Sequence, residues 1–94
     1  MLPQADGRLR RVSPFFVPRI LPNMAAGAVS IQYGLMRPNI CASTACASGN
    51  HSIGDAYQLI RNGSADVMVA GAAEAAIDAL SIGGFSRMKA LSTR

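Results

Sequence analysis

One stretch of this sequence, residues 39–71, constrains the fold more strongly than any other. Residues 39–44 carry the branched and small side chains that are typical of a strand. Residues 45–49 are all small and suit a tight turn better than an ordinary strand. We therefore predict that the chain turns sharply at Cys46, at the end of a strand.

A helix is predicted directly after this turn, over residues 47–62. Apolar residues recur at i, i+3, i+4 and i+7, as on one face of an amphipathic helix: Ile53, Ala56, Tyr57 and Ile60. The Asn62-Gly63 pair is a typical helix end. The apolar run in residues 66–71 predicts a second strand, covered on both faces as in a parallel sheet. The sequence thus indicates an α/β fold with a strand-helix-strand unit.

The position of Cys46 favours a chemical role for its thiol. A thiol at the carboxyl end of a strand and in the first turn of a helix lies beside unpaired backbone N–H groups and the positive end of the helix dipole. Both favour the thiolate, which is the nucleophilic form. Cys46 is therefore a candidate acyl-accepting nucleophile, although cysteine usage alone favours an inert core residue.

The other candidate ligands and bases are less well placed. Cys41 lies within the predicted strand and is expected to be a covered, structural residue. His51 follows Cys46 by five positions, so on a helix it points about 140° around the axis from the nucleophile. We therefore expect His51 to be a surface or packing residue. A zinc site formed by Cys41, Cys46 and His51 would fail for the same reason and would also lack a fourth ligand. Glu74 and Asp78 are expected to be a solvated or structural pair.

The residues before this stretch predict a loop and then a second helix. Residues 1–11 are polar without periodicity and are expected to be a loop or disordered. Three prolines should keep the following segment extended or turning: Pro14, Pro18 and Pro22. A helix is expected to begin after Asn23, a typical N-cap residue, and to end at Gly34. Its buried face is expected to contain Met24, Ala28, Ile31 and Leu35.

Length and composition indicate part of a larger body. A chain of 94 residues allows one small domain at most, and two strands alone would leave open edges. No apolar run reaches the roughly eighteen residues of a membrane span. The net charge is +4, with arginines concentrated near the amino end: Arg8, Arg10, Arg11 and Arg19. A solvated basic loop is the simplest interpretation, and no nucleic-acid partner is predicted because no aromatic residues accompany these arginines.

Motifs in a fixed order carry a family resemblance. Around the cysteine they are Ser43-Thr44-Ala45-Cys46-Ala47-Ser48-Gly49, Ile53-Gly54-Asp55-Ala56 and Ala65-Asp66-Val67-Met68-Val69-Ala70-Gly71. Upstream and downstream they are Ser13-Pro14-Phe15-Phe16-Val17-Pro18, Asn23-Met24-Ala25-Ala26-Gly27, Gly83-Gly84-Phe85-Ser86-Arg87 and Ala90-Leu91-Ser92-Thr93-Arg94. Together they resemble the β-ketoacyl-acyl carrier protein synthases, most closely the elongating synthases of bacterial and mitochondrial fatty acid synthesis. The resemblance identifies residues 1–94 as part of the N-terminal, thiolase-like domain.

The resemblance implies a fold and a reaction. The fold would be a fragment of the layered α/β/α/β/α architecture, with the central helix beginning at Cys46. Cys46 would take an acyl group from an acyl carrier thioester, and malonyl carrier would then lose carbon dioxide and attack the acyl-cysteine. The Cys46 backbone N–H would contribute to the oxyanion hole, and Phe85 would lie near the acyl pocket.

The resemblance also implies partners and a compartment. Acyl carrier protein, which is acidic, would dock on the basic surface, and the full-length enzyme would be a homodimer. No cofactor is implied, because phosphopantetheine is carried by the acyl carrier protein. The mitochondrion is the expected location, with the bacterial cytoplasm as the alternative.

The family pattern is only partly present in this chain. Later family motifs, with two histidines, a lysine and a glycine-rich phenylalanine segment, are not in these 94 residues, so the isolated chain is expected to be inactive. Two alternatives remain open. One is a polyketide-type ketosynthase or another thiolase-superfamily enzyme, and the other is a truncated, non-catalytic product that binds full-length subunits.

Overall fold

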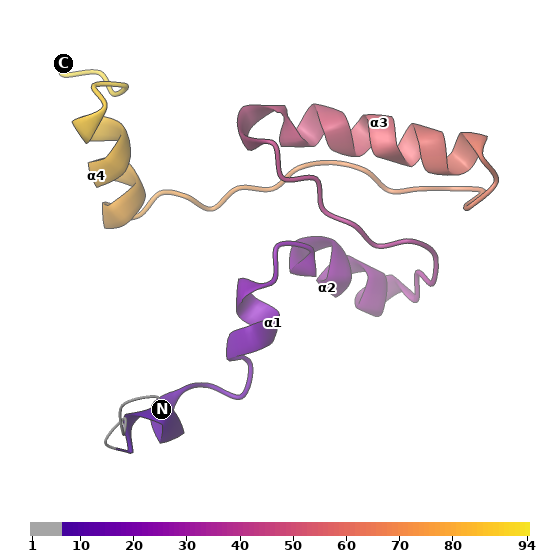
Figure 1. The fold of residues 1–94 in the computed structure, drawn as a ribbon, viewed down its shortest axis with the longest axis horizontal. Coiled ribbons are helices and arrows are strands. Elements are labelled where there is room, and N and C mark those ends of the chain that lie inside the picture. The colour runs from indigo at the N-terminus through magenta and orange to yellow at the C-terminus, as the bar shows by residue number, and fades with distance from the viewer. Residues whose placement is uncertain (1–6) are drawn as a thin grey trace, which may run out of the picture.

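The longest helix, α3 (Ser48–Arg61), forms where the sequence predicts one. It appears in a computed structural model that describes residues 7–94 (Figure 1). Gly63 ends it with a φ of 81°, a left-handed conformation that glycine adopts without steric cost. The Ser64 N–H donates to the Leu59 carbonyl at 2.9 Å, which satisfies a carbonyl at the end of the helix. The predicted helix and its end are therefore confirmed.

The second predicted helix is α2 (Met24–Tyr33), which ends at Gly34 with φ 65°. Asn23 precedes it as expected, but its side chain does not cap the helix. Instead its Nδ2 donates to Asn39 Oδ1 at 3.1 Å, and Asn39 Nδ2 donates to Ser30 Oγ at 3.4 Å. Asn39 begins the segment that leads to Cys46, so this polar contact attaches that segment to α2.

A short helix, α1 (Phe16–Ile20), occupies part of the segment that the prolines were expected to keep extended. That prediction is wrong for these residues. Pro18 lies in the first turn of α1, where a backbone N–H has no partner within the helix and its loss costs little. Of the loop expected over residues 1–11, residues 1–6 lie outside the described part, and Arg8–Arg11 form a 3-10 helix, η1.

The two predicted strands, residues 39–44 and 66–71, follow extended paths without strand pairing. Figure 1 shows the second of them running beside α3. Neither forms a sheet within residues 7–94. A strand needs a neighbouring strand for its backbone hydrogen bonds, and these two segments do not pair with each other. Only the helix of the predicted strand-helix-strand unit is therefore confirmed.

The described chain has almost no core. Among the described side chains, the buried residues are Gly27, Ala56 and Ala65. The radius of gyration is 18.1 Å, whereas a compact chain of this length has about 12 Å. The predicted buried face of α2 is wrong here, since Ile31 is 77% exposed and Leu35 46%. On the apolar face of α3, Ala56 is buried but Tyr57 is 57% exposed. Within residues 7–94, neither face has a second layer to cover it.

The last helix, α4 (Ala79–Arg87), begins at a side-chain cap. Asp78 accepts hydrogen bonds from the Ser81 N–H at 2.9 Å and from the Ser81 hydroxyl at 3.1 Å. These bonds, the backbone bond first, hold the pKa of Asp78 below its ordinary value. Asp78 is thus a structural helix cap, whereas Glu74 lies outside any helix, because α4 begins only at Ala79.

We expect α4 to lose helix content in acid. The folded-state pKa of Asp78 is lowered, so the cap contributes above the unfolded-state pKa of about 3.9 and is lost as pH falls through the lower, folded-state value. The ¹³Cα chemical shifts of residues 79–83 should report this loss. Asp78→Asn keeps an acceptor that does not titrate, so its α4 should be insensitive to acid, and Asp66→Ala should behave as the unchanged chain does. An equal acid response in Asp78→Asn would contradict this assignment.

Candidate active site

Cys46 lies in a sharp turn between an extended segment and a helix. The turn is a 3-10 helix, η2 (Ala45–Ala47), which leads directly into α3. Ala45 has φ 50°, one of two non-glycine residues with positive φ among those described. This conformation is unfavourable for a residue with a Cβ atom and reverses the chain within one residue. The predicted sharp turn is present, although the regular α-helix begins at Ser48 rather than at Cys46.

The turn leaves both the thiol and the backbone N–H of Cys46 accessible. The Cys46 side chain is exposed. The backbone hydrogen bonds of η2 are donated by the N–H groups of Ala47 and Ser48, to Thr44 and Ala45 respectively, and not by that of Cys46. Within residues 7–94, the Cys46 N–H therefore remains available to a bound group.

Side-chain hydrogen bonds link this turn to α3. Ser48 Oγ accepts a hydrogen bond from the Thr44 N–H at 2.9 Å and donates one to the Ala45 carbonyl at 2.7 Å. Thr44 Oγ1 lies 2.7 Å from His51 Nδ1. These roles of Ser48 and Thr44 were not predicted from the sequence. The only signal was the preference of serine and threonine for helix N-termini.

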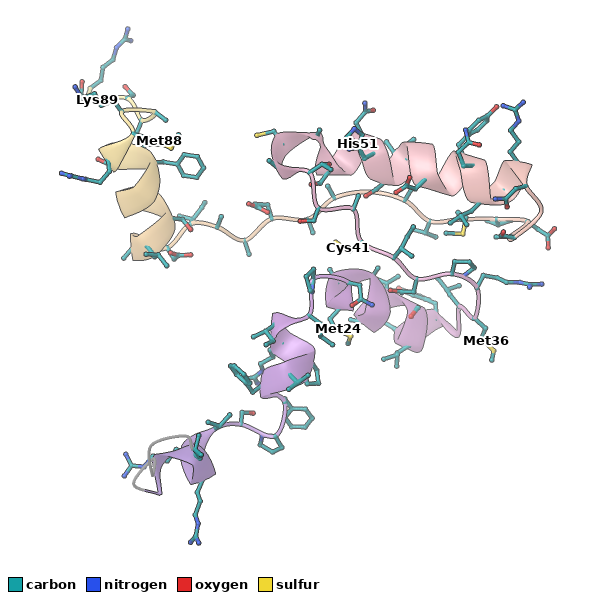
Figure 2. The ribbon with its side chains drawn as sticks, viewed as in Figure 1. Met24, Met36, Cys41, His51, Met88 and Lys89 are labelled. Carbon is teal, nitrogen blue, oxygen red and sulfur yellow. The ribbon has the colours of Figure 1, made fainter. Side chains whose placement is uncertain are left out.

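Cys41 and His51, the other candidate ligands or bases, do not form a catalytic arrangement with Cys46. Cys41 is exposed, so the expectation of a covered residue is wrong here, because within residues 7–94 its segment has no paired strand. His51 is an exposed residue on α3, as predicted; Figure 2 shows it apart from Cys41, and its Nδ1 lies against the Thr44 hydroxyl. Within residues 7–94, no group of three or more His, Cys, Asp or Glu side chains is arranged to hold a metal ion.

The first turn of α3 lies close to the extended segment that follows the helix. A Cβ atom added at Gly49 would be 3.0 Å from the Ala72 Cβ, whereas one added at Gly54 would meet nothing within 4 Å. Glycine at position 49 therefore permits a close approach between the start of α3 and residues 66–77. This approach lies three residues after Cys46.

A cavity of about 540 Å³ separates the two extended segments. It lies between α2, the segment that leads to Cys41, one side of α3 and the segment after Ala65. Its lining is mostly apolar and includes Val29, Leu35, Ile40, Leu59, Val67 and Val69. Neither Cys46 nor Phe85 lines it.

Phe85 is not brought together with Cys46. It lies on α4 and is 51% exposed. Figure 1 shows α4 apart from α3, at the end of the extended segment. Of the arginines near the amino end, Arg10, Arg11 and Arg19 are exposed.

Comparison with known proteins assigns the family. The whole chain, residues 1–94, matches the model of the β-ketoacyl synthase N-terminal domain. The chain therefore belongs to the β-ketoacyl synthase family. This family implies a thiolase-like fold; the described residues form helices without paired strands.

Curated relatives carry a more specific name. A mitochondrial 3-oxoacyl-acyl-carrier-protein synthase of Arabidopsis thaliana is 64% identical over 89 residues, which cover 95% of this chain and 19% of the relative. A 3-oxoacyl-acyl-carrier-protein synthase 2 of Staphylococcus aureus is 52% identical over 84 residues, covering 89% of this chain and 21% of the relative. The chain thus spans about a fifth of the length of these relatives. No helix within residues 7–94 is long and apolar enough to cross a membrane.

Proposed function

We propose that this chain is the active-cysteine segment of a 3-oxoacyl-acyl carrier protein synthase, which extends fatty acyl chains. The observation that carries the proposal is the placement of Cys46, exposed in a sharp turn that leads into α3. The printed names of the relatives support this reaction over that of a polyketide-type ketosynthase. The truncated, non-catalytic product has no supporting observation.

The proposed reaction has two stages. The Cys46 thiolate attacks the carbonyl carbon of an acyl thioester on acyl carrier protein, and the carrier thiol leaves with a proton. Malonyl carrier then loses carbon dioxide, and the electron pair of the broken bond forms a carbanion. This carbanion attacks the acyl-cysteine carbonyl, forms the new carbon–carbon bond and releases the Cys46 thiolate.

The Cys46 backbone N–H is the oxyanion donor that this chain would contribute. Negative charge develops on the thioester oxygen during each attack, and a fixed N–H group stabilises that charge. The N–H of Cys46 is not used by the backbone bonds of η2, which supports this role. The histidines of the second stage would come from outside these 94 residues, so the isolated chain would not condense substrates. Phe85 as a wall of the acyl pocket rests on family resemblance.

The extended segments would be strands in the whole enzyme. Residues of both segments line one apolar cavity, which leaves room for further strands of the whole enzyme beside them. Such strands would supply the missing backbone partners and complete the layered α/β/α/β/α fold. A homodimer of the whole enzyme is part of the same proposal.

The partner of the reaction would be acyl carrier protein. Its acidic surface would meet the exposed Arg10, Arg11 and Arg19. The chain would need no cofactor of its own, since the carrier brings the phosphopantetheine. The relatives include a mitochondrial and a bacterial enzyme, and we propose the mitochondrion because the Arabidopsis relative shares 64% of the aligned residues.

Thiol mapping in a hybrid enzyme tests the proposal. In this hybrid, the present chain replaces the segment that it matches in the Arabidopsis enzyme. Brief iodoacetamide treatment near neutral pH should label Cys46 ahead of Cys41, because only Cys46 lies in the turn before α3. Pretreatment with an acyl carrier thioester should protect Cys46 alone. Equal labelling of the two thiols, or no protection, would exclude Cys46 as the acyl acceptor.

A further inference from the structure

The turn that carries Cys46 needs a restraint. Ala45 adopts φ 50°, which is unfavourable for any residue with a Cβ atom and persists only where surrounding contacts hold it. Relaxation of this residue would change the direction in which the next residue, Cys46, projects. A nucleophile must be held close to its attack geometry, so the contacts that fix Ala45 affect the reaction rate.

The Ser48 hydroxyl contacts both sides of Ala45. It accepts from the Thr44 N–H at 2.9 Å, before the turn, and donates to the Ala45 carbonyl at 2.7 Å, after it. One hydroxyl thus uses its donor and an acceptor lone pair to connect the peptide group that precedes Thr44 with the one that follows Ala45. An ordinary N-cap serine instead accepts from N–H groups further along its helix. The bonds of Ser48 therefore serve the turn rather than α3.

We propose that Ser48 is a positioning residue that holds the Ala45 turn, and with it the Cys46 thiol and N–H, in the conformation required for acyl transfer. This inference rests on the proposed role of Cys46 as the nucleophile. Ser48 acts through the backbone and need not touch the substrate.

The Thr44–His51 contact is a second restraint on the same turn. Thr44 Oγ1 and His51 Nδ1 lie 2.7 Å apart and join the residue before Ala45 to the first turns of α3. The Thr44 backbone is already held by Ser48, so the two contacts fix the backbone and the side chain of one residue. This contact occupies Nδ1 of His51, which gives the exposed histidine a structural function.

Four variants of the hybrid enzyme test this role. Ser48→Ala and Ser48→Val remove the hydroxyl, whereas Ser48→Thr keeps it, and valine and threonine differ in shape by little else. Ser52→Ala is the matched control, because Ser52 Oγ makes only a bond of 2.9 Å to the Ser48 carbonyl within the helix. The amplitude of the acylation burst gives the concentration of properly folded active sites. The rate constant of acyl-Cys46 formation can then be compared between variants that fold to different extents.

The rate constants distinguish positioning from stability. We expect Ser48→Ala and Ser48→Val to lower acylation and iodoacetamide alkylation of Cys46 by about tenfold to a hundredfold, and Ser48→Thr and Ser52→Ala to stay within about threefold of the parent. A merely structural role would lower the burst amplitude and leave the rate constant unchanged, which would overturn the inference. If Ser48→Ala fails to fold, equal rate constants for the threonine and valine variants would overturn it too.

The two proposals fail in different ways. If Cys46→Ala keeps condensing activity in the hybrid, Cys46 is not the nucleophile and the proposed function fails. Alkylation of Cys46 requires no synthase activity, so the Ser48 series still reports the conformation of the turn. Normal alkylation and acylation in Ser48→Val, together with loss of activity in Cys46→Ala, would overturn the Ser48 inference alone.

Discussion

Replacing Cys46 with alanine in the hybrid enzyme is expected to lower its condensing activity by roughly 10⁴-fold or more, as loss of a nucleophile does in other enzymes with covalent intermediates. Without the thiol there is no acyl-enzyme, so the malonyl-derived carbanion has no acyl group to attack. The measurement is product formation from acyl carrier and malonyl carrier thioesters. The acyl-enzyme itself should be lost as well, which intact-mass spectrometry of the protein would show directly.

Cys41→Ala is the matched control for this substitution. Cys41 is also an exposed thiol, five positions earlier, but it lies before the turn and its Sγ contacts only the neighbouring Ala42 carbonyl at 3.4 Å. Its replacement should leave kcat within about twofold of the parent, because Cys41 takes no part in the proposed acyl transfer. Comparable losses in the two variants would mean that the turn at Ala45 does not select the reactive thiol.

The features that the sequence predicted correctly are local ones. The ends of α2 and α3 follow from Gly34 and Gly63, each of which adopts the left-handed conformation that ends a helix. The turn at Cys46 follows from a run of small residues. These signals act within a few positions of the chain, so they operate whether or not the rest of a domain is present.

The features that were predicted wrongly, or not confirmed, depend on distant partners. The strands at residues 39–44 and 66–71 need neighbouring strands, and the apolar face with Ile53 and Tyr57 needs a covering layer. α1 is different: the three prolines were expected to keep this segment extended or turning, although the first turn of a helix tolerates Pro18.

The roles of Ser48 and Thr44 show why the site was only partly predictable. A cysteine in a small-residue turn can be recognised from its neighbours in sequence. The bonds that hold the turn depend on the direction of each hydroxyl, which residue types alone do not specify. The sequence therefore indicated the nucleophile, and the structure adds the contacts that restrain its turn.

The isolated 94-residue chain is expected to associate and to unfold without a cooperative transition. Its accessible surface is 8712 Å², whereas a compact protein of this mass exposes roughly 5,200 Å². If about half of the excess is apolar, burying it would contribute on the order of 40 kcal/mol. Apolar surface of this extent is unfavourable in water, so the arrangement seen here requires covering surfaces. Strand edges and exposed residues such as Ile31 and Ile77 would meet those of other copies.

Sedimentation velocity tests the predicted association, and urea unfolding tests the predicted loss of cooperativity. The hybrid enzyme is the control. In the hybrid, the same residues should be covered, so we expect one sedimenting species and a single sharp transition. The isolated chain should give larger, heterogeneous species whose size grows with concentration, and a gradual change in circular dichroism with urea. Ile31→Lys and Ile77→Lys should reduce that association by placing charges on exposed apolar positions. A compact monomer with a cooperative transition would contradict the prediction, because residues 39–44 and 66–71 would then have found partners within the chain itself.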